Sequence, residues 1–308
     1  MSSPPVETAA AHRCGYAAIV GRTNVGKSTL LNRLVGEKLA IVSPVPQTTR
    51  HRILGVKNVS GGQILYIDTP GFHKPRFRLN RDMIQAAQEA LRDADVLVCL
   101  IDASEGVGPG DHFVFTHLGG VRAPVILALN KIDLIGRGRI LPLIDEVRRE
   151  AAFAEIVPIS ASEGTQCDLL EQLILRHLPE HPPLYPPDYL TDQPERLLAA
   201  EMIREQVLLL TRQEIPHAVA VGVDRFAELQ GGSLRIEASV YVERDSQKAI
   251  LVGRNGQMLK EIGSRARAEI ARCLGRPAAV FLWVKVQPDW RQDARALARL
   301  RRDAAPGG

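Results

Sequence analysis

Short, continuous runs of apolar residues alternate with amphipathic segments along the first half of the chain. Five of these runs are predicted to be strands, at Tyr16–Val20, Ile64–Ile67, Val96–Ile101, Val125–Leu129 and Ile156–Ile159. Helical spacing of apolar residues is found at Asn80–Arg92, Ile140–Glu150 and Cys167–His177. Continuous apolar strands are typical of a parallel sheet that helices cover on both faces. Residues 15–178 are therefore predicted to form an α/β domain with a mostly parallel sheet.

A proline-rich stretch separates this half of the chain from a different pattern. Residues 179–194 contain six prolines, which remove backbone donors and fix φ, so this stretch is predicted to be a stiff, extended linker. Beyond it the pattern predicts a helix at 195–213, strands at 217–223 and 234–243, two helices split at Gly253–Gly256, and a strand at 279–286. Residues 195–287 are therefore predicted to form a separate α+β domain. Trp283 alternates with apolar neighbours on the last strand and is assigned to its core.

Length and composition fit this division. The chain has 308 residues, enough for two domains, and its 45% hydrophobic and 24% charged residues are typical of a globular protein. Membrane-spanning chains are excluded, because no apolar run approaches the roughly 20 residues of a spanning helix. Residues 1–14 carry no targeting signal and are expected to be a disordered tail. The four cysteines lie far apart, as expected for free thiols in the cytoplasm.

Positive charge is concentrated near the C-terminus. The formal charge of the whole chain is only +4, but residues 244–302 contain 14 lysines and arginines against five acidic residues. This distribution predicts a polyanionic partner for the second domain. Residues 288–308 form a basic tail, which is either a solvated helix face or an additional contact to nucleic acid.

A phosphate-binding loop follows the first predicted strand directly. Residues 21–28 read GRTNVGKS, which matches G-x-x-x-x-G-K-S, and they open a helix. Glycines let backbone N–H groups surround a polyphosphate, Lys27 adds positive charge at the β- and γ-phosphates, and Ser28 supplies a hydroxyl ligand for Mg²⁺. The predicted nucleotide contacts in this loop are Gly21, Asn24, Val25, Gly26, Lys27, Ser28 and Thr29.

A carboxylate is predicted to lie beside this loop. The predicted strand at Ile64–Ile67 is followed by the sequence DTPG, from Asp68 to Gly71, and the carboxyl ends of parallel strands are where α/β domains bind ligands. Alone, this sequence would indicate only a turn that ends the strand. Together with Lys27 and Ser28 it makes Asp68 the second predicted Mg²⁺ anchor, acting through water.

The base is predicted from residues that follow the last two predicted strands. Asn130, Lys131 and Asp133 occur in the sequence NKID, and the Asp133 carboxylate can accept both the N1–H and the 2-amino group of guanine. Adenine has neither donor at these positions, so the site is predicted to select guanine. Asn130 is expected to brace the loop, and Lys131 to lie over the ring. Ser160 and Ala161 end the last strand, where the Ala161 N–H can donate to the guanine O6.

These elements in this order resemble the translation-factor-related GTPases, and residues 43–52, SPVPQTTRHR, resemble the corresponding segment of the Era family. Era proteins join a P-loop GTPase domain to a C-terminal type II KH domain, so the resemblance covers nearly the whole chain. It implies hydrolysis of GTP to GDP and phosphate with Mg²⁺. It also implies that Thr49, ranked above Thr48, closes on Mg²⁺ and the γ-phosphate. Lys27, Thr49, Asp68 and Gly71 are the expected catalytic residues.

Two positions modify this expectation. Phe72 stands where Ras-like enzymes usually have a glutamine that orients water, so slow intrinsic turnover is predicted. Asn24 matches a P-loop asparagine that related GTPases use to hold K⁺, which makes K⁺ a second candidate cation. Because of Phe72, the alternative function is an RNA-binding scaffold that binds guanine nucleotide with negligible hydrolysis.

The G-x-x-G turn of the second domain predicts an RNA groove. Glycines allow close approach of a nucleic-acid backbone, and KH domains clamp about four single-stranded nucleotides there. The predicted RNA contacts are Gly253, Arg254, Asn255, Gly256, Lys260 and Arg265. The resemblance implies that the target is the 3′ end of 16S rRNA, with a role in maturation of the 30S ribosomal subunit. A cytoplasmic monomer is expected, and peripheral association with the inner face of the cell membrane is kept as an alternative.

Overall fold

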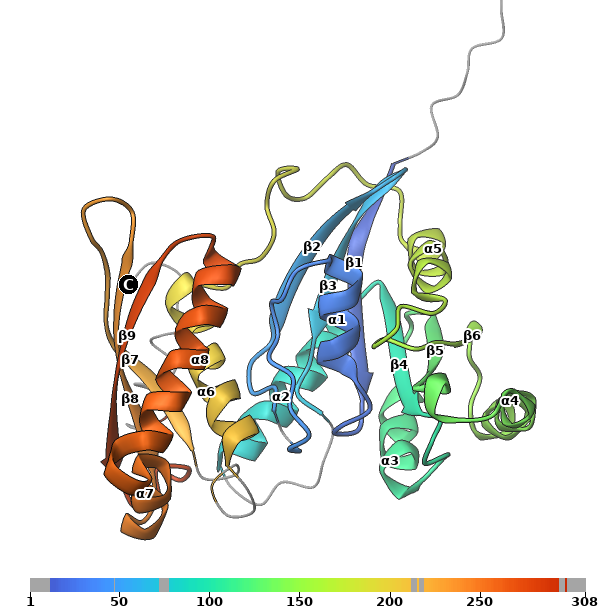
Figure 1. The fold of residues 1–308 in the computed structure, drawn as a ribbon. Coiled ribbons are helices and arrows are strands. Elements are labelled where there is room, and N and C mark those ends of the chain that lie inside the picture. The colour runs from blue at the N-terminus through green and yellow to red at the C-terminus, as the bar shows by residue number, and fades with distance from the viewer. Residues whose placement is uncertain are drawn as a thin grey trace, which may run out of the picture.

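The first half of the chain folds around a six-stranded sheet (Figure 1). The structure is a computed structural model that describes residues 12–46, 48–71, 78–211, 215, 219–293 and 297. The strands lie in the order β2-β3-β1-β4-β5-β6, and only the β2–β3 pair is antiparallel. Their bounds are β1 (Arg13–Gly21), β2 (Ile53–Val59), β3 (Gly62–Asp68), β4 (Val96–Asp102), β5 (Val125–Asn130) and β6 (Glu155–Pro158). The predicted mostly parallel sheet is thus confirmed.

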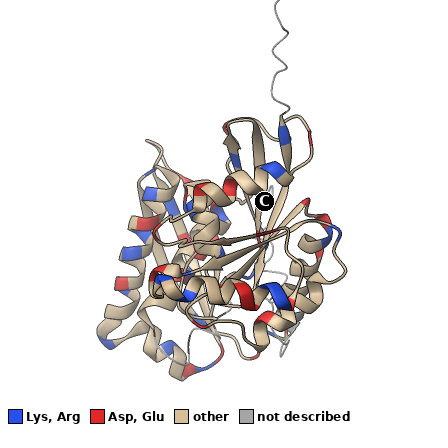
Figure 2. Ribbon diagram, turned by 90° about the vertical axis from the view of Figure 1, so that its right-hand side faces the viewer, with Lys and Arg blue, Asp and Glu red and all other residues tan. Residues whose placement is uncertain are grey.

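Helices cover both faces of this sheet. Side chains of α1 (Lys27–Val35) and α5 (Cys167–His177) share one buried cluster with the sheet. Those of α2 (Arg78–Asp93), α3 (Pro109–Leu118) and α4 (Ile140–Glu150) share another on the opposite face. Along the ribbon in Figure 2, positions of basic and acidic residues are interspersed, and neither sign dominates.

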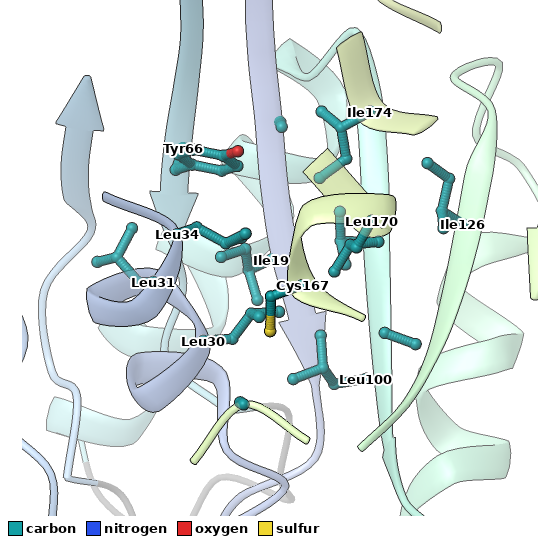
Figure 3. Close-up of a cluster of buried hydrophobic side chains, with 14 of the residues drawn as sticks. Ile19, Leu30, Leu31, Leu34, Tyr66, Leu100, Ile126, Cys167, Leu170 and Ile174 are labelled. Atoms are coloured by element: carbon teal, nitrogen blue, oxygen red, sulfur yellow. The ribbon is translucent and has the colours of Figure 1, made fainter. Parts of the chain in front are cut away.

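The core beneath α1 and α5 positions the loop between β1 and α1. Leu30, Leu31 and Leu34 of α1 pack against Ile19 of β1 and Tyr66 of β3 (Figure 3). Each of these side chains is buried, so α1 is fixed rigidly against the sheet. The start of α1 therefore lies at the carboxyl edge of β1, next to the ends of β3 and β5.

The second half of the chain forms a three-stranded sheet with helices on one face. The helices are α6 (Glu195–Leu210), α7 (Asp245–Val252) and α8 (Gln257–Leu274), with a 3₁₀ turn η3 (Arg254–Gly256) between the last two. The strands β7 (Ala220–Glu228), β8 (Leu234–Val242) and β9 (Ala278–Val286) lie in this order, β8 and β9 being parallel. The element order αββααβ predicts an α+β KH domain, and the fold confirms it. In the described residues no helix is both long and apolar enough to span a bilayer.

The two tryptophans have opposite environments, and the assignment of Trp283 to the core was wrong. Val280, Leu282 and Val284 of β9 pack against the core, so the residues that alternate with them point the other way. Trp283 is 47% exposed, whereas Trp290 is 1% exposed and packs with Tyr241. Both faces of β9 are apolar in sequence, but its core contacts are made on the face that packs with α6 and α8.

The proline-rich linker is anchored to the first domain over most of its length. The buried side chain of Gln63 accepts the N–H groups of Leu184 and Tyr185 at 2.9 and 3.0 Å. Farther along, the N–H of Val56 in β2 donates to the carbonyl oxygen of Leu190 at 2.8 Å. Because β2 is the edge strand of the six-stranded sheet, the linker continues its hydrogen bonding. The linker is thus docked on the first domain, and it contains a turn in which the Tyr189 N–H donates to the Pro186 carbonyl at 3.0 Å; its stiffness stays a prediction.

Candidate functional site

A cavity of about 350 Å³ lies at the carboxyl edge of the six-stranded sheet. Its lining includes eight residues that the sequence predicts for the site, Asn24, Gly26, Lys27, Ser28, Thr29, Thr49, Gly71 and Lys131. The loop between β1 and α1 approaches β5 closely. Gly26 has φ of 99°, and a Cβ atom there would lie 2.3 Å from Nδ2 of Asn130. Only glycine fits this backbone, which explains its place in the motif.

Lys27 is buried and held by backbone oxygens. Its Nζ donates to the carbonyl oxygens of Gly21 and Arg22 at 3.2 and 2.7 Å. Burial lowers the pKa of Lys27 to about 8, although the nearby Asp68 carboxylate acts in the opposite direction. A polyphosphate in the cavity would stabilise the charged form, as expected of a phosphate-binding lysine.

Three oxygen-bearing side chains converge beside Lys27. The Ser28 Oγ lies 2.6 Å from the Thr49 Oγ1 and 2.7 Å from the Asp68 Oδ2, and the Thr49 Oγ1 lies 3.2 Å from the same carboxylate oxygen. The other oxygen of Asp68, Oδ1, is buried and has no hydrogen-bond partner among the described residues. Burial raises the pKa of Asp68, while Lys27 opposes this shift. Hard oxygen donors with one unpaired carboxylate oxygen fit Mg²⁺.

The structure distinguishes Thr49 from Thr48. The Thr48 hydroxyl bonds to Ser43 Oγ at 2.7 Å and donates to the Val45 carbonyl at 2.6 Å, away from Asp68. Only Thr49 lies where the Mg²⁺ role would need it, and that role stays a prediction. Gln47, Phe72 and the residues after Phe72 to position 77 lie outside the described part of the chain.

Two residues join the phosphate loop to neighbouring segments. Asn24, with φ of 66°, donates from Nδ2 to the carbonyl oxygen of Pro44 at 3.0 Å. The K⁺ role of Asn24 stays a prediction, and its side-chain Oδ1 is the atom that could serve it. Gly71 lies directly against the backbone of Thr23, where a Cβ atom would approach to 3.0 Å.

The residues predicted to bind guanine lie together at the ends of β5 and β6. Asn130 donates from Nδ2 to the carbonyl of Val25 at 2.8 Å and accepts the Ala161 N–H at 2.9 Å. The Ala161 N–H, which was predicted to donate to the guanine O6, thus donates to Asn130 in this structure. Its contact with guanine stays a prediction. Ser160 is buried next to it, and Asp133 is exposed in the 3₁₀ turn η1 (Ile132–Leu134).

Sequence reasoning missed a carboxylate that positions Lys131. Asp102, at the end of β4, is buried, and its Oδ2 lies 2.6 Å from the Lys131 Nζ. This contact, with hydrogen bonds from Ser104, lowers the pKa of Asp102 against the effect of burial. An aspartate that ends a parallel strand, as Asp68 does, is the signal that could have revealed it.

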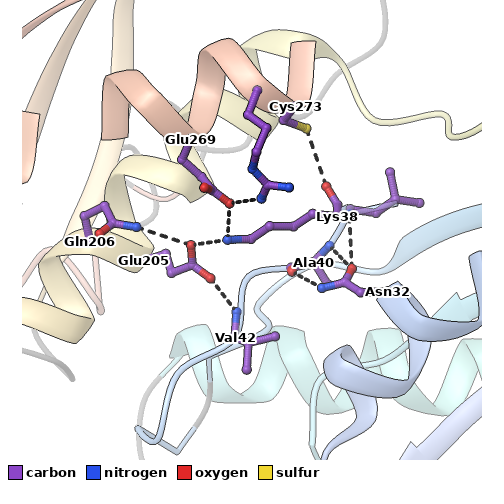
Figure 4. Close-up of polar contacts among 10 residues, drawn as sticks. Asn32, Lys38, Ala40, Val42, Glu205, Gln206, Glu269 and Cys273 are labelled. Carbon is purple, nitrogen blue, oxygen red and sulfur yellow. Dashed lines mark hydrogen bonds and ion pairs between the residues drawn. The ribbon is translucent and has the colours of Figure 1, made fainter. Parts of the chain in front are cut away.

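Sequence reasoning also missed a group of residues that join the segment before Thr49 to the KH domain (Figure 4). Lys38 bridges two carboxylates, with its Nζ 2.6 Å from both Glu205 of α6 and Glu269 of α8. Glu205 is only 2% exposed and also accepts the N–H of Val42 at 2.8 Å. Ile41 is buried in the KH core. These partners lie far apart in sequence, so no local pattern indicates which residues pair.

Helix α6 also reaches the residues around Thr49. The buried Arg204 donates to the carbonyl oxygen of Thr48 and pairs with Glu201. Arg50 donates to the Val219 carbonyl at 2.8 Å, just before β7. Leu209, near the end of α6, lines the nucleotide cavity itself. The KH domain therefore contacts residues on both sides of Thr49.

The predicted RNA residues divide between a turn and a groove. Gly253, Arg254, Asn255 and Gly256 form the turn between α7 and α8, with φ of 50° at Asn255. A groove of about 650 Å³ runs between α8 and β9, and Gly256, Lys260 and Arg267 line it. Arg265 instead lies 2.6 Å from Glu261 and is not among the lining residues.

Comparisons with known proteins agree with this geometry. Residues 16–131 match the family model described as a 50S ribosome-binding GTPase, and residues 214–291 match the KH domain. The chain is 47% identical to GTPase Era of Lacticaseibacillus paracasei, over 94% of this chain and 96% of that one. It is 48% identical to GTPase Era of Geobacter metallireducens, over 94% and 97% of the two chains.

Two crystal structures of Era superimpose on nearly the whole chain. An Aquifex aeolicus Era variant bound to GDP.AlF4⁻ has a TM-score of 0.91 and 45% identity, covering 95% of this chain and 100% of that one. Era in complex with MgGDPNP and nucleotides 1506–1542 of 16S ribosomal RNA has a TM-score of 0.92 and 45% identity, covering 96% and 100%. With the oxygen cluster beside Lys27 and the KH groove in one chain, these matches show that the protein belongs to the Era family of GTPases.

Proposed function

We propose that this GTPase binds the 3′ end of 16S rRNA through its KH groove and acts in maturation of the 30S subunit. The observation that carries the proposal is the position of the segment around Thr49. Residues 38–46 and 48–50 contact the nucleotide cavity on one side and helix α6 of the KH domain on the other. A nucleotide-dependent change at Thr49 would therefore be transmitted to the RNA-binding domain.

The nucleotide chemistry follows from the residues around the cavity. Lys27 and the backbone N–H groups that begin α1 bind the phosphates and stabilise negative charge as water attacks the γ-phosphorus and the bond to GDP breaks. Ser28, Thr49 and Asp68 would hold Mg²⁺, which supplies charge neutralisation at the β- and γ-phosphates. Asp133 would accept the two guanine donors, and Asp102 holds the Lys131 ammonium beside that position.

The RNA assignment is supported by the groove and by the relative crystallised with the 16S fragment. We would measure multiple-turnover phosphate release from GTP with and without an RNA of nucleotides 1506–1542, in K⁺ and in Na⁺ buffers. Lys27→Ala should abolish turnover, because it removes the charge that binds and stabilises the phosphates. Nucleotide binding without turnover would favour the alternative, an RNA-binding scaffold, and equal rates in the two buffers would exclude the K⁺ role of Asn24.

The cellular target needs an independent test. Crosslinking the GTP-bound and GDP-bound protein to total RNA should enrich fragments from the 3′ end of 16S rRNA. No enrichment of small-subunit rRNA in either state would refute this partner. We further propose that the protein is a monomer in the cytoplasm. Sedimentation equilibrium would test the monomer. Co-flotation with anionic lipid vesicles would instead support peripheral membrane association.

A further inference from the structure

The wall of the KH groove formed by β9 carries two exposed aromatic rings. Phe281 and Trp283 are 43% and 47% exposed, and both line the groove between this strand and α8. β9 is an edge strand of its sheet, so the groove wall continues around it onto the face opposite α6 and α8. Large exposed aromatic side chains beside a binding groove indicate a contact surface.

The fold does not account for the exposed indole. Val280, Leu282 and Val284 supply the core contacts of β9. The Phe281 ring is covered on one side by the guanidinium of Arg235, 4.9 Å from the ring centroid. Trp283 has no ring or cation partner within the described residues. Its ring is therefore available for an external planar group.

The charges around the groove favour a nucleic acid over a protein as this group. Lys260 and Arg267 line the opposite wall, and neither forms an ion pair with another described residue. Lys285 extends the positive charge along β9, although Asp224 lies 3.5 Å from it. Cations on one wall and aromatic rings on the other match the phosphate backbone and the bases of a single strand.

We propose that Trp283 stacks on an unpaired base of single-stranded RNA, next to the nucleotides held at the Gly253–Gly256 turn, with Phe281 as a neighbouring stacking surface. The proposal rests on the proposed function, because it requires RNA in the groove. It adds a recognition element outside the turn, one that reads the planar face of a base and extends the bound strand beyond about four nucleotides. Stacking of this kind changes affinity by about 5- to 100-fold per base.

The chain offers a direct spectroscopic probe, since Trp290 is 1% exposed and Trp283 is the accessible indole. Titration with a single-stranded RNA from the 3′ end of 16S rRNA should quench the tryptophan emission of the wild type. Trp283→Ala should weaken binding about 5- to 100-fold and remove the quenching. Trp283→Phe should retain most of the affinity. Leu229→Ala, at an equally exposed apolar residue, should change neither.

A second measurement locates the base. A series of RNAs would each carry one abasic nucleotide, at successive positions. At the position of the stacked base, removing the base should weaken binding to the wild type as much as Trp283→Ala does, and it should not weaken binding to the alanine variant further. Wild-type affinity of the alanine variant, or equal losses at that position in both proteins, would overturn the proposal. If Trp283→Ala kept the RNA affinity of the wild type but lost binding to 30S subunits, the stacking proposal would also be overturned, and Trp283 would instead contact a protein partner. If the wild type bound no RNA, the proposed function itself would fail. Matching thermal unfolding curves would confirm that the variants fold.

Discussion

Replacing Glu205 with glutamine tests whether α6 holds the segment that leads to Thr49. The carboxylate of Glu205 is 2% exposed and has three partners, the Lys38 ammonium at 2.6 Å, the Val42 N–H at 2.8 Å and the Gln206 amide at 3.5 Å. Glutamine keeps the size and one acceptor oxygen but removes the charge. It can therefore accept hydrogen bonds on one side only, either from Lys38 and Gln206 or from Val42, and its amide hydrogens face the donors on the other side.

The expected magnitude follows from these contacts. A hydrogen bond to a charged group contributes about 1.5–3 kcal/mol, and breaking a buried ion pair costs about 3–5 kcal/mol. Lys38 keeps Glu269 at 2.6 Å, so the loss should fall near the lower end, at about 2–3 kcal/mol. The population in which residues 38–46 are released from α6 should then rise about 30- to 150-fold.

Amide hydrogen exchange measures this population directly. The Val42 amide should exchange about 30- to 150-fold faster in Glu205→Gln, while amides in β4 should keep their rates. Glu269→Gln is the matched control, because Glu269 shares Lys38 but the Val42 N–H donates to Glu205 instead, so its effect at Val42 should be smaller. Unchanged exchange at Val42, or an equal effect of both variants, would refute the idea that Glu205 holds this segment.

Three further predictions concern the base, the phosphates and the linker. Because the Lys27 pKa is about 8, GDP binding should take up about half a proton at pH 8 and almost none at pH 6.5, and the affinity for GDP should fall as the pH rises above 8. Calorimetry in buffers of different ionisation enthalpy measures this proton uptake. A binding enthalpy at pH 8 that does not depend on the buffer would contradict the prediction. Asp133→Asn should weaken GTP binding at least about 100-fold and favour xanthosine triphosphate, whose C2 carbonyl can accept a hydrogen bond from the amide. Competition binding gives the ratio of the two nucleotide affinities. An unchanged affinity for GTP would rule out the guanine contact of Asp133. Gln63→Ala removes the hydrogen bonds to Leu184 and Tyr185 and should lower the free energy of unfolding by about 2–4 kcal/mol in urea titration, whereas a change below about 0.5 kcal/mol would show that the linker contacts are dispensable.

Hydrophobic pattern predicted the buried elements of the fold but not the half-exposed ones. Five parallel strands were identified because both of their faces are covered, which makes them continuously apolar. β2 was not assigned, since it lies at the sheet edge and exposed Asn58 interrupts its apolar run. α3, with the sequence PGDHFVFTHL, was missed because its polar and apolar residues do not follow a clear helical spacing.

The site shows the same division between local and distant information. Lys27 and Ser28 belong to one contiguous loop, so their spacing was sufficient to predict them. Thr49 needed a family resemblance, because nothing in its local sequence points to Asp68. Glu205 and its partner Lys38 are 167 positions apart, and only the folded chain brings them together. Charged residues inside the buried helix α6 were the available signal, because such groups are rarely buried unless they are paired.

The docked linker also determines how the molecule can be divided. An edge strand with unpaired N–H and carbonyl groups is a template for aggregation. Here Leu190 and Thr191 occupy the backbone groups of β2 at Val56 and Leu54. A GTPase domain truncated before residue 179 would expose this edge and should self-associate, whereas one that extends to residue 193 should stay soluble. The linker thus protects the domain that precedes it from intermolecular strand pairing.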